Sequence, residues 1–371
     1  MRSRAEFTTT AVDGEVRAGN LALTHGVVKT PAFMPVGTRG AVKGVDSADL
    51  KELGAQMVLS NTYHLMLRPG AETVAAMGGL GAFQGWDGPT LTDSGGYQIF
   101  SLEPQITEEE AVFRSTYDGS EVRLSPEEAM RVQQLLGADV AMVLDVLIGL
   151  PAPTEAVEDA LEHTLRWSER ALKVHTGDDQ ALFGIIQGGV DARLRARSAK
   201  ATAALGFDGF GIGGLSVGET AEERSIALEA TVPELPSDKV RYVMGLGDTE
   251  GVLDAIAVGC DLFDCVWPTR LARHGRVLTP DGDFNLRRAE FVEDPRPLHD
   301  ECDCRACRQV GRSYLRHLLQ TRELTVFRLL SIHNLTYTHR LMAQTRESIA
   351  AGTFDAHRAE LVERRANGVL G

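Results

Sequence analysis

Three cysteines, Cys302, Cys304 and Cys307, fall within six residues. A CxCxxC turn can offer three thiolates to one tetrahedral metal ion, for which zinc is the usual occupant. A fourth ligand must come from elsewhere, and spacing alone leaves four histidines open: His299, His317, His333 and His339. Because three cysteines and one histidine fill the coordination sphere, we expect one structural zinc ion per chain and no catalytic water.

Three aspartates, Asp93, Asp145 and Asp264, each follow a short apolar run. A single aspartate at such a place often caps a turn or a helix. Asp264, however, has apolar residues on both sides, and burying a charge is costly unless the charge is paired or used. Two carboxylates in one pocket suit glycosidic chemistry, in which one attacks the anomeric carbon and the other handles the leaving group's proton. A third carboxylate and Gln187 could hydrogen-bond the edge of a guanine-like ring.

The segment directly after Asp264 carries three arginines, Arg270, Arg273 and Arg276. One interpretation is a solvated loop. The alternative is a phosphate or nucleic-acid contact beside the reaction centre.

The hydrophobic pattern predicts the scaffold that must bring these residues together. Short apolar runs recur, most of them followed by an amphipathic stretch such as Thr154–His175 or Ala192–Leu205. The runs are Pro31–Pro35, Gln56–Ser60, Pro89–Thr92, Val140–Leu144, Ala181–Ile186, Gly209–Ile212, Val240–Met244 and Cys260–Phe263. Such alternation over ~250 residues is expected of a (β/α)₈ TIM barrel, with a doubly wound sheet as the alternative. In a barrel, the polar and glycine-rich peptides that end these runs would face one mouth, where active sites lie.

Two segments interrupt the alternation. Residues 102–124, with the turn Asp118-Gly119-Ser120, predict an inserted β-hairpin. Residues 274–335, rich in Pro, Cys and Arg, predict a zinc-binding subdomain inserted after the eighth strand, and Thr325–Arg364 is expected to be mostly helical. We therefore expect a single catalytic domain over residues 1–371 that carries both insertions.

Composition excludes several classes of protein. The chain has 371 residues, 43% of them hydrophobic, which is enough for a sizeable core. It lacks any run of 18 apolar residues, which predicts no membrane span, and no apolar segment of a secretory signal follows Met1. All five cysteines lie in the last third, and an odd number so placed favours a reducing cytoplasm over disulfides.

Six stretches, in order along nearly the whole chain, resemble those of the bacterial tRNA-guanine transglycosylases, also called queuine tRNA-ribosyltransferases. They are LTDSGGYQIFS at 91–101, GIIQGG at 184–189, GIGGLSVGE at 211–219, YVMGLG at 242–247, FDCVWPTR at 263–270 and the CxCxxC at 302–307. The resemblance implies a (β/α)₈ barrel with a zinc subdomain. It also implies replacement of guanine at the anticodon wobble position of GUN tRNAs by a 7-deazaguanine base, a step of queuosine biosynthesis.

The resemblance also implies roles for individual residues. Asp264 matches the nucleophile that attacks C1′ of the ribose to form a covalent ribosyl-enzyme, and Asp93 matches the general acid/base. The base-binding positions are Asp93, Ser94, Tyr97, Asp145, Gln187, Gly213, Gly214 and Met244, of which Tyr97 and Met244 cover the two faces of the ring. The RNA-binding positions are Gly245, Leu246, Gly247, Asp248, Thr249, Glu250, Gly251, Thr269, Arg270, Leu271, Ala272 and Arg273. Among the four histidines, the match selects His333 as the fourth zinc ligand.

Lys43, Tyr314 and His317 resemble residues of the family's homodimer interface. Many bacterial members carry Glu-Cys where this chain has Val146-Leu147, which changes the wall beside the base's 7-substituent. His274 stands where asparagine is common, with little expected consequence. Val217 still resembles the bacterial form, whose incoming base is preQ1 (7-aminomethyl-7-deazaguanine). We therefore expect preQ1, with the bulkier queuine as the alternative that the apolar pair favours.

Two other functions are compatible with the resemblance. A non-catalytic tRNA-binding subunit would keep the barrel but lose Asp93 or Asp264, and both are present. An enzyme that inserts a deazaguanine into DNA would keep both.

The net charge of −14 argues against binding nucleic acid through the protein's overall field. Its distribution changes that conclusion. Residues 266–345 hold 13 of the 38 Lys and Arg but only 9 of the 52 Asp and Glu, so this segment carries +4 and the rest −18. RNA is therefore expected to approach the segment that holds the arginines and the zinc motif, with binding that weakens as salt rises.

Overall fold

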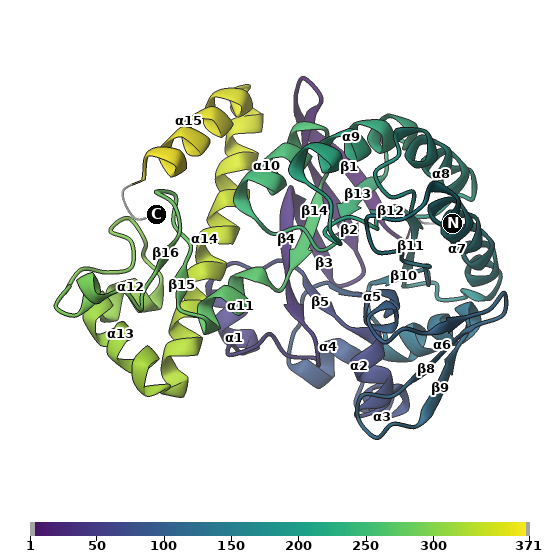
Figure 1. Ribbon diagram of the computed structural model, residues 1–371, viewed down its shortest axis with the longest axis horizontal. Helices are drawn as coiled ribbons and strands as arrows, with labels where there is room; N and C mark the ends of the chain where they lie inside the picture. The colour runs from purple at the N-terminus through teal and green to yellow at the C-terminus, as the bar shows by residue number, and fades with distance from the viewer. Residues whose placement is uncertain (1–3, 369–371) are drawn as a thin grey trace.

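The computed structural model describes residues 4–368, so both ends of the predicted domain, 1–3 and 369–371, lie outside the described residues. A closed barrel of parallel strands forms its centre (Figure 1). In spatial order the strands are β10 (Val140–Met142), β11 (Ala181–Ile186), β12 (Gly209–Ile212), β13 (Val240–Val243), β14 (Leu262–Cys265), β4 (Ala32–Gly37), β5 (Val58–Ser60) and β6 (Thr90–Thr92). The pairing of β6 with β10 closes the ring, which confirms the predicted (β/α)₈ barrel over the doubly wound sheet.

The eight predicted runs all coincide with barrel strands, because strands enclosed by helices are apolar on both faces. All eight agree within two residues at each end, and the eighth strand begins and ends two residues later than its run. The surrounding helices include the two predicted from periodicity, α7 (Thr154–Val174) and α8 (Ala192–Ala204). The others around the barrel are α1 (Ser47–Glu52), α2 (Thr62–Leu67), α3 (Ala71–Ala76), α4 (Gly79–Gln84), α5 (Gly96–Phe100), α6 (Pro126–Leu136), α9 (Ala221–Thr231), α10 (Thr249–Ala257) and α11 (Trp267–Arg273).

An antiparallel sheet that the sequence did not reveal precedes the barrel. Its strands are β1 (Glu6–Asp13), β2 (Val16–Leu23) and β3 (Gly26–Thr30). A buried ion pair ties it to the barrel: Arg17 donates from Nε to Asp261 Oδ1 (3.0 Å) and from Nη2 to Oδ2 (2.6 Å). Because Asp261 directly precedes β14, this sheet lies at the N-terminal end of the barrel, opposite the mouth.

Residues 102–124 form three short antiparallel strands: β7 (Gln105–Ile106), β8 (Ala111–Arg114) and β9 (Glu121–Leu124). Their tip reaches α2, where Tyr117 Oη lies 3.1 Å from His64 Nδ1.

The C-terminal segment forms a lobe beside the barrel (Figure 1). It contains β15 (Arg276–Val277), β16 (Phe284–Asn285), α12 (Arg305–Gln309) and α13 (Arg312–Thr321). The long helix α14 (Leu324–Ala351) lies between this lobe and the barrel, packing against α12 and α13 on one side and β4 and α11 on the other, and α15 (Phe354–Asn367) follows it. Within residues 4–368, the helices are all too short or too polar to cross a membrane.

Candidate active site

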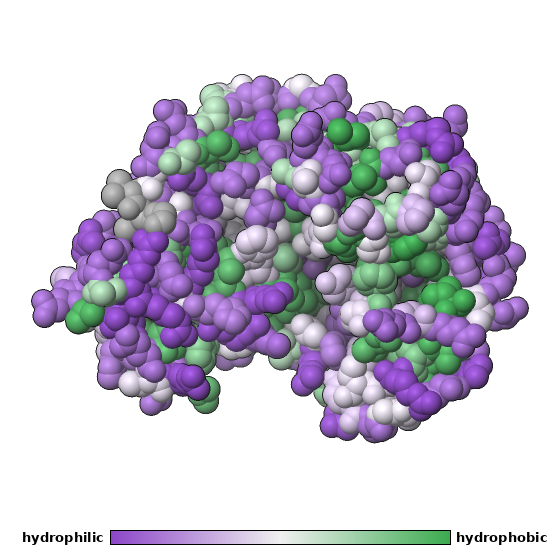
Figure 2. Space-filling view, viewed as in Figure 1, coloured by the Kyte–Doolittle hydropathy of each residue, from purple (hydrophilic) through white to green (hydrophobic). Residues whose placement is uncertain are grey.

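The carboxyl ends of the barrel strands surround a cavity of about 550 Å³. Figure 2 shows the surface hollowed near the middle of the molecule, with hydrophobic residues inside the hollow and hydrophilic ones around it. Many predicted site residues line this one cavity: Asp93, Ser94, Tyr97, Asp145, Gly213, Gly214, Met244, Gly245, Leu246, Gly247, Asp248, Asp264 and Arg270. Segments from almost the whole length of the barrel therefore converge, as strand ends in a barrel must.

Asp93 follows β6 and is held by groups that follow β5. Its Oδ2 accepts from Asn61 Nδ2 (2.5 Å), and its Oδ1 accepts from the backbone N–H groups of Thr62 (2.9 Å) and Gly95 (3.1 Å). Burial raises the pKa of Asp93, the hydrogen bonds from Thr62 and Asn61 lower it, and the negative charge of Asp264 raises it; together they bring it to about 7. Asp93 can therefore hold a proton near neutral pH and release it.

Asp264 ends β14 on the same cavity. Its Oδ1 accepts from Tyr242 Oη (2.6 Å) and from the backbone N–H of Gly245 (2.7 Å). No donor among residues 4–368 reaches Oδ2, so one oxygen is oriented and the other stays available to a ligand. Burial raises the pKa of Asp264, whereas the hydrogen bonds from Tyr242 and Gly245 favour the ionised form. The pKa of Tyr242 is itself raised by burial and by the charge of Asp264, so this phenol remains a donor.

Asp145 follows β10 and forms a polar group with Ser94 and Gln187. Ser94 Oγ donates to Oδ1 (3.1 Å), and Gln187 Nε2 donates to Oδ2 (2.7 Å). Burial raises the pKa of Asp145 against these two hydrogen bonds. Gln187 itself is buried behind Asp145 and does not line the cavity, so its direct effect is to orient the carboxylate. Gly96 must lack a side chain, because a Cβ there would lie 2.5 Å from Asp145 Oδ1.

A residue that the sequence did not reveal supports two of the loops at the end of the barrel that holds the cavity. Arg195 on α8 is fully buried and donates to backbone carbonyls of two neighbouring loops: Gly189 (2.6 Å), Gly213 (2.8 Å) and Gly214 (3.3 Å). Burial lowers the pKa of its guanidinium to about 10, so the group stays charged at neutral pH. Arg195 thereby fixes the backbone next to Gln187 and across Gly213-Gly214.

The three cysteines of the CxCxxC turn meet His333 of α14. Their Sγ atoms lie 3.3–3.6 Å from His333 Nδ1, and the four ligand atoms lie within 4.8 Å of one another. His333 Nε2 lies 3.1 Å from the carbonyl oxygen of Leu278, which orients the ring so that Nδ1 faces the thiols. This cluster of Cys302, Cys304, Cys307 and His333 can hold a metal ion.

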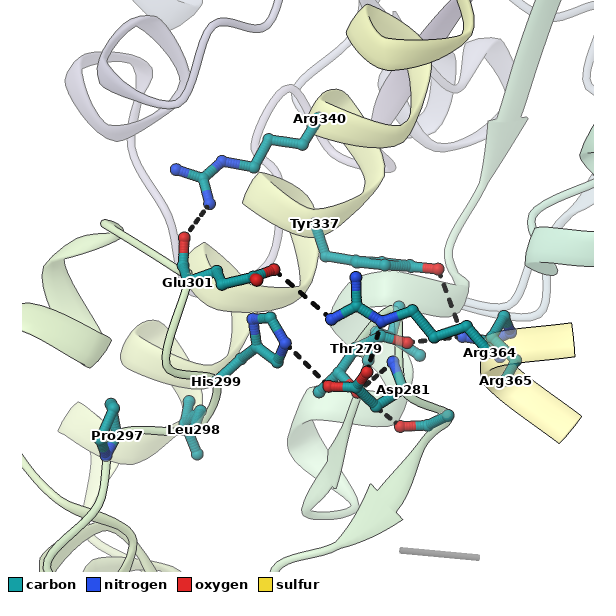
Figure 3. Close-up of polar contacts among 12 residues, drawn as sticks. Thr279, Asp281, Pro297, Leu298, His299, Glu301, Tyr337, Arg340, Arg364 and Arg365 are labelled. Atoms are coloured by element: carbon teal, nitrogen blue, oxygen red, sulfur yellow. Dashed lines mark hydrogen bonds and ion pairs between the residues drawn. The ribbon is translucent and has the colours of Figure 1, made fainter. Parts of the chain in front are cut away.

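The competing histidines have other partners. His299 Nε2 lies 2.9 Å from Asp281 Oδ2, in a network that also contains Arg340 and Arg364 (Figure 3). His339 is buried against Phe33, with the two rings in edge contact.

A cavity of about 900 Å³ beside the cluster is larger than the one at the barrel mouth, but it contains neither Asp93 nor Asp264. Its arginines are already bonded, Arg340 to the carbonyl oxygen of Glu301 and Arg364 to Asp281 and Glu301 (Figure 3).

The predicted RNA-binding residues divide by exposure. Arg270 is exposed at the cavity mouth, and Arg273 beside it donates to the carbonyl of Thr269 (2.9 Å). Ala272 is fully buried, and Thr249 is buried with its hydroxyl 3.0 Å from Tyr337 Oη. Two others make contacts at the start of α10: Asp248 accepts a capping hydrogen bond from the backbone N–H of Gly251, and Glu250 pairs with Arg365. Leu271 in α11 is half-buried.

Comparison with known proteins now decides the family. The family model described as queuine tRNA-ribosyltransferase matches residues 13–367. This chain belongs to that family. Three relatives, each named queuine tRNA-ribosyltransferase, come from Thermus thermophilus, Desulforamulus reducens and Stenotrophomonas maltophilia. They are 48%, 50% and 47% identical over 361, 335 and 368 residues, covering 97%, 90% and 98% of this chain and 94%, 90% and 98% of their own.

The positions at which this chain departs from other queuine tRNA-ribosyltransferases, and those predicted at a dimer interface, have the following surroundings. Leu147 lines the cavity, and the backbone N–H of Val146 bonds Thr164 Oγ1 (3.0 Å). Lys43, Tyr314 and His317 are exposed, as is His274.

Proposed function

We propose that this enzyme exchanges guanine at the wobble position of tRNAs with a GUN anticodon for preQ1, a step of queuosine biosynthesis. One observation carries the proposal: two partly buried carboxylates with different surroundings share one cavity. Asp264 keeps one oxygen free, while Asp93 has a pKa of about 7. Such a division between a nucleophile and a proton carrier is what glycosidic exchange requires. A non-catalytic tRNA-binding subunit would not need it.

The chemistry follows in two balanced steps. Asp264 Oδ2 attacks C1′ of the ribose, the bond from C1′ to the purine N9 breaks, and Asp93 gives its proton to the departing guanine. The incoming base then loses its N9 proton to Asp93, and its nitrogen attacks C1′ and displaces Asp264. Two inversions at C1′ give net retention, and Tyr242 and Gly245 hold the nucleophile in place throughout.

Recognition of the base is assigned to Asp145, Ser94 and the Gly213-Gly214 backbone at one end of the cavity. Gln187 acts by orienting Asp145. Tyr97 and Met244, which both line the cavity, are assigned to the two faces of the ring. The side chain of Tyr97 is 60% exposed without a ligand, so its ring is available for stacking.

The test is a base-exchange assay with labelled guanine, preQ1 and queuine in parallel on one GUN tRNA. Incorporation of guanine and preQ1 supports the proposal, and absence of all three contradicts it. Stronger incorporation of queuine would favour the alternative base, for which the apolar wall at Leu147 is the supporting observation. Duplex DNA offered in competition with tRNA tests the DNA-modifying alternative.

The nucleophile has a separate test. The native enzyme, mixed with RNA and no incoming base, should leave a protein–RNA adduct that survives a denaturing gel. Asp264→Asn should leave none, because an amide oxygen is a poor nucleophile. An undiminished adduct from this variant would show that another residue attacks C1′.

We propose that the metal at Cys302, Cys304, Cys307 and His333 is zinc, because three thiolates and an imidazole are its preferred donors. None of the four ligands lines the cavity that holds Asp93 and Asp264, so we assign the ion a structural role. Metal analysis should give one zinc per chain, lost in Cys304→Ser together with thermal stability. A metal-free protein that is equally stable and active would contradict this assignment. The remaining free thiols fit a reducing cytoplasm.

A homodimer is proposed on the exposure of Lys43, Tyr314 and His317. Light scattering should give twice the chain mass, and Tyr314→Ala should lower it. Arg270 is proposed as the main side-chain RNA contact of its loop, because it is exposed at the mouth and lacks an ion-pair partner within residues 4–368. Ala272 and Thr249 are buried, so any effect they have on RNA is through the backbone or through neighbours.

A further inference from the structure

Positive charge continues around the barrel mouth beyond Arg270. In the barrel, β14 is followed by β4 and then by β5. The short helix α11 after β14 carries Arg270, the loop after β4 carries Arg39, and Arg68 ends the short helix that follows β5. The three exposed cations therefore follow three neighbouring strands, along one arc of the rim. Thr38, next to Arg39, lines the catalytic cavity itself.

Arg39 and Arg68 are held at the same aromatic ring. The guanidinium carbon of Arg39 lies 5.4 Å from the centroid of the Tyr117 ring, and that of Arg68 lies 4.8 Å from it. Tyr117 is fixed in turn, because its hydroxyl lies 3.1 Å from His64 Nδ1. The inserted sheet β7–β9 thus supplies the platform that places two arginines from different barrel loops beside each other.

These two like charges form no ion pair within the described part of the chain, although 52 acidic residues are present. The nearby carboxylate of Asp118 accepts from Ser120, through the backbone N–H (3.1 Å) and the hydroxyl (2.8 Å). Hydrogen bonds from Ser120 and Ser115, and after them the charge of Arg68, lower the pKa of Asp118, so this carboxylate feels Arg68 without pairing with it. Burial, together with the charges of Arg39 and Lys43, lowers the pKa of His64, so the surroundings are already electropositive. Elsewhere on this acidic surface arginines pair readily, as Arg123 does with Glu110.

We propose that Arg39 and Arg68, positioned on Tyr117, bind the phosphate backbone of the substrate RNA strand after it passes Arg270 on α11. The proposal rests on the proposed function, and it extends the RNA track over the β4 and β5 side of the rim. A phosphodiester suits the pair, because a guanidinium offers two parallel N–H groups to two phosphate oxygens. The base-binding groups occupy the other side of the mouth, after β6, β10 and β12, so a strand along this arc places its ribose over Asp264 and its base toward Asp145.

The test compares Arg39→Ala/Arg68→Ala with the matched double variant Lys173→Ala/Lys200→Ala. Lys173 and Lys200 are exposed at the C-terminal ends of α7 and α8, at the opposite end of the barrel. Filter binding of a GUN anticodon stem-loop gives Kd over a series of salt concentrations, without requiring exchange. Loss of two contacts to a single strand should reduce the slope of log Kd against log salt by about 1.4 and weaken binding roughly tenfold at low salt. Arg39→Lys/Arg68→Lys should restore much of the slope.

Exchange kinetics separate this proposal from the proposed function. The arginine variant should raise KM for RNA while leaving kcat and KM for the base unchanged. If the native enzyme exchanges no base, the proposed function fails, yet the binding comparison still decides the phosphate contact. Equal Kd values and salt slopes in the two double variants would overturn the contact. The contact would also be overturned if the arginine variant bound RNA more weakly at an unchanged salt slope and had a lower mass by light scattering. The arginines would then stabilise the homodimer and not the RNA complex.

Discussion

Replacing Asp93 by asparagine should abolish exchange. It should also remove a loss of stability that the native enzyme undergoes as pH rises, so the variant becomes more stable in comparison with the native enzyme at higher pH. The pKa of Asp93 is about 7 in the folded protein, against an ordinary value of 3.8. Between these values the folded state holds a proton that the unfolded state has lost. Native stability therefore falls as pH rises from about 4 to about 7 and then stays level, which is the reverse of an ion-paired carboxylate.

The magnitude follows from the size of that window. Each unit of pKa difference corresponds to about 1.4 kcal/mol, and a group with these two values loses about 2.6 kcal/mol between pH 5 and pH 8. Asp93→Asn has no such loss, since an amide does not ionise. Asp145 and Asp264, whose pKa values are also raised, are present in both proteins, so their contributions cancel in the difference.

Urea unfolding at pH 5, 6, 7 and 8, at one protein concentration, measures this difference. The free energy of unfolding of the variant minus that of the native enzyme should become more positive by about 2.6 kcal/mol across the series. The control is Asp178→Asn, which removes a surface carboxylate whose side chain is 89% exposed and pairs with Arg4 (3.7 Å). A change for Asp93→Asn no larger than that of this control would refute the assignment of Asp93 as a carboxyl kept protonated by burial.

Two further changes test how the loops proposed to recognise the base are held. Gly214→Ala should raise KM for the base severalfold, because the new Cβ would collide with Gln187 Oε1 and because the φ of +67° at this position is strained for alanine. Kinetics with saturating RNA measure this KM, and an unchanged value would contradict the argument. Arg195→Lys should raise KM for the base about tenfold with KM for RNA unchanged, since one ammonium cannot replace hydrogen bonds to three loop carbonyls. Equal increases in both KM values would mean that Arg195 serves only folding.

The sequence allowed the barrel to be predicted, because each of its strands is a short apolar run that helices cover on the outside. The carboxylates Asp93, Asp145 and Asp264 were found for a related reason: each ends such a run, where barrel geometry requires convergence. The N-terminal sheet escaped prediction. Its β1 strand is largely exposed, so it lacks the apolar signal of the barrel strands.

Arg195 could not be recognised either, because it stands in a basic helix between Arg193 and Arg197. Nothing local distinguishes the arginine that turns inward, and only packing against two loops does so. The fourth ligand of the metal-binding cluster had the same difficulty. Spacing left four histidines open, and the fold selects His333 by bringing α14 across the CxCxxC turn.

The barrel is sealed where its first and last strands meet, with Phe33 of β4 in register with Phe263 of β14. This contact joins segments from opposite ends of the barrel sequence, and such long-range pairings tend to form late in folding. On the proposed mechanism Asp264 is also the last catalytic group to leave the ribosome, and it lies on the sealing strand itself. An incompletely folded chain therefore has a proton carrier but no positioned nucleophile. Recovery of exchange activity during refolding should consequently follow the closing of this seam, and lag behind the return of helical circular dichroism.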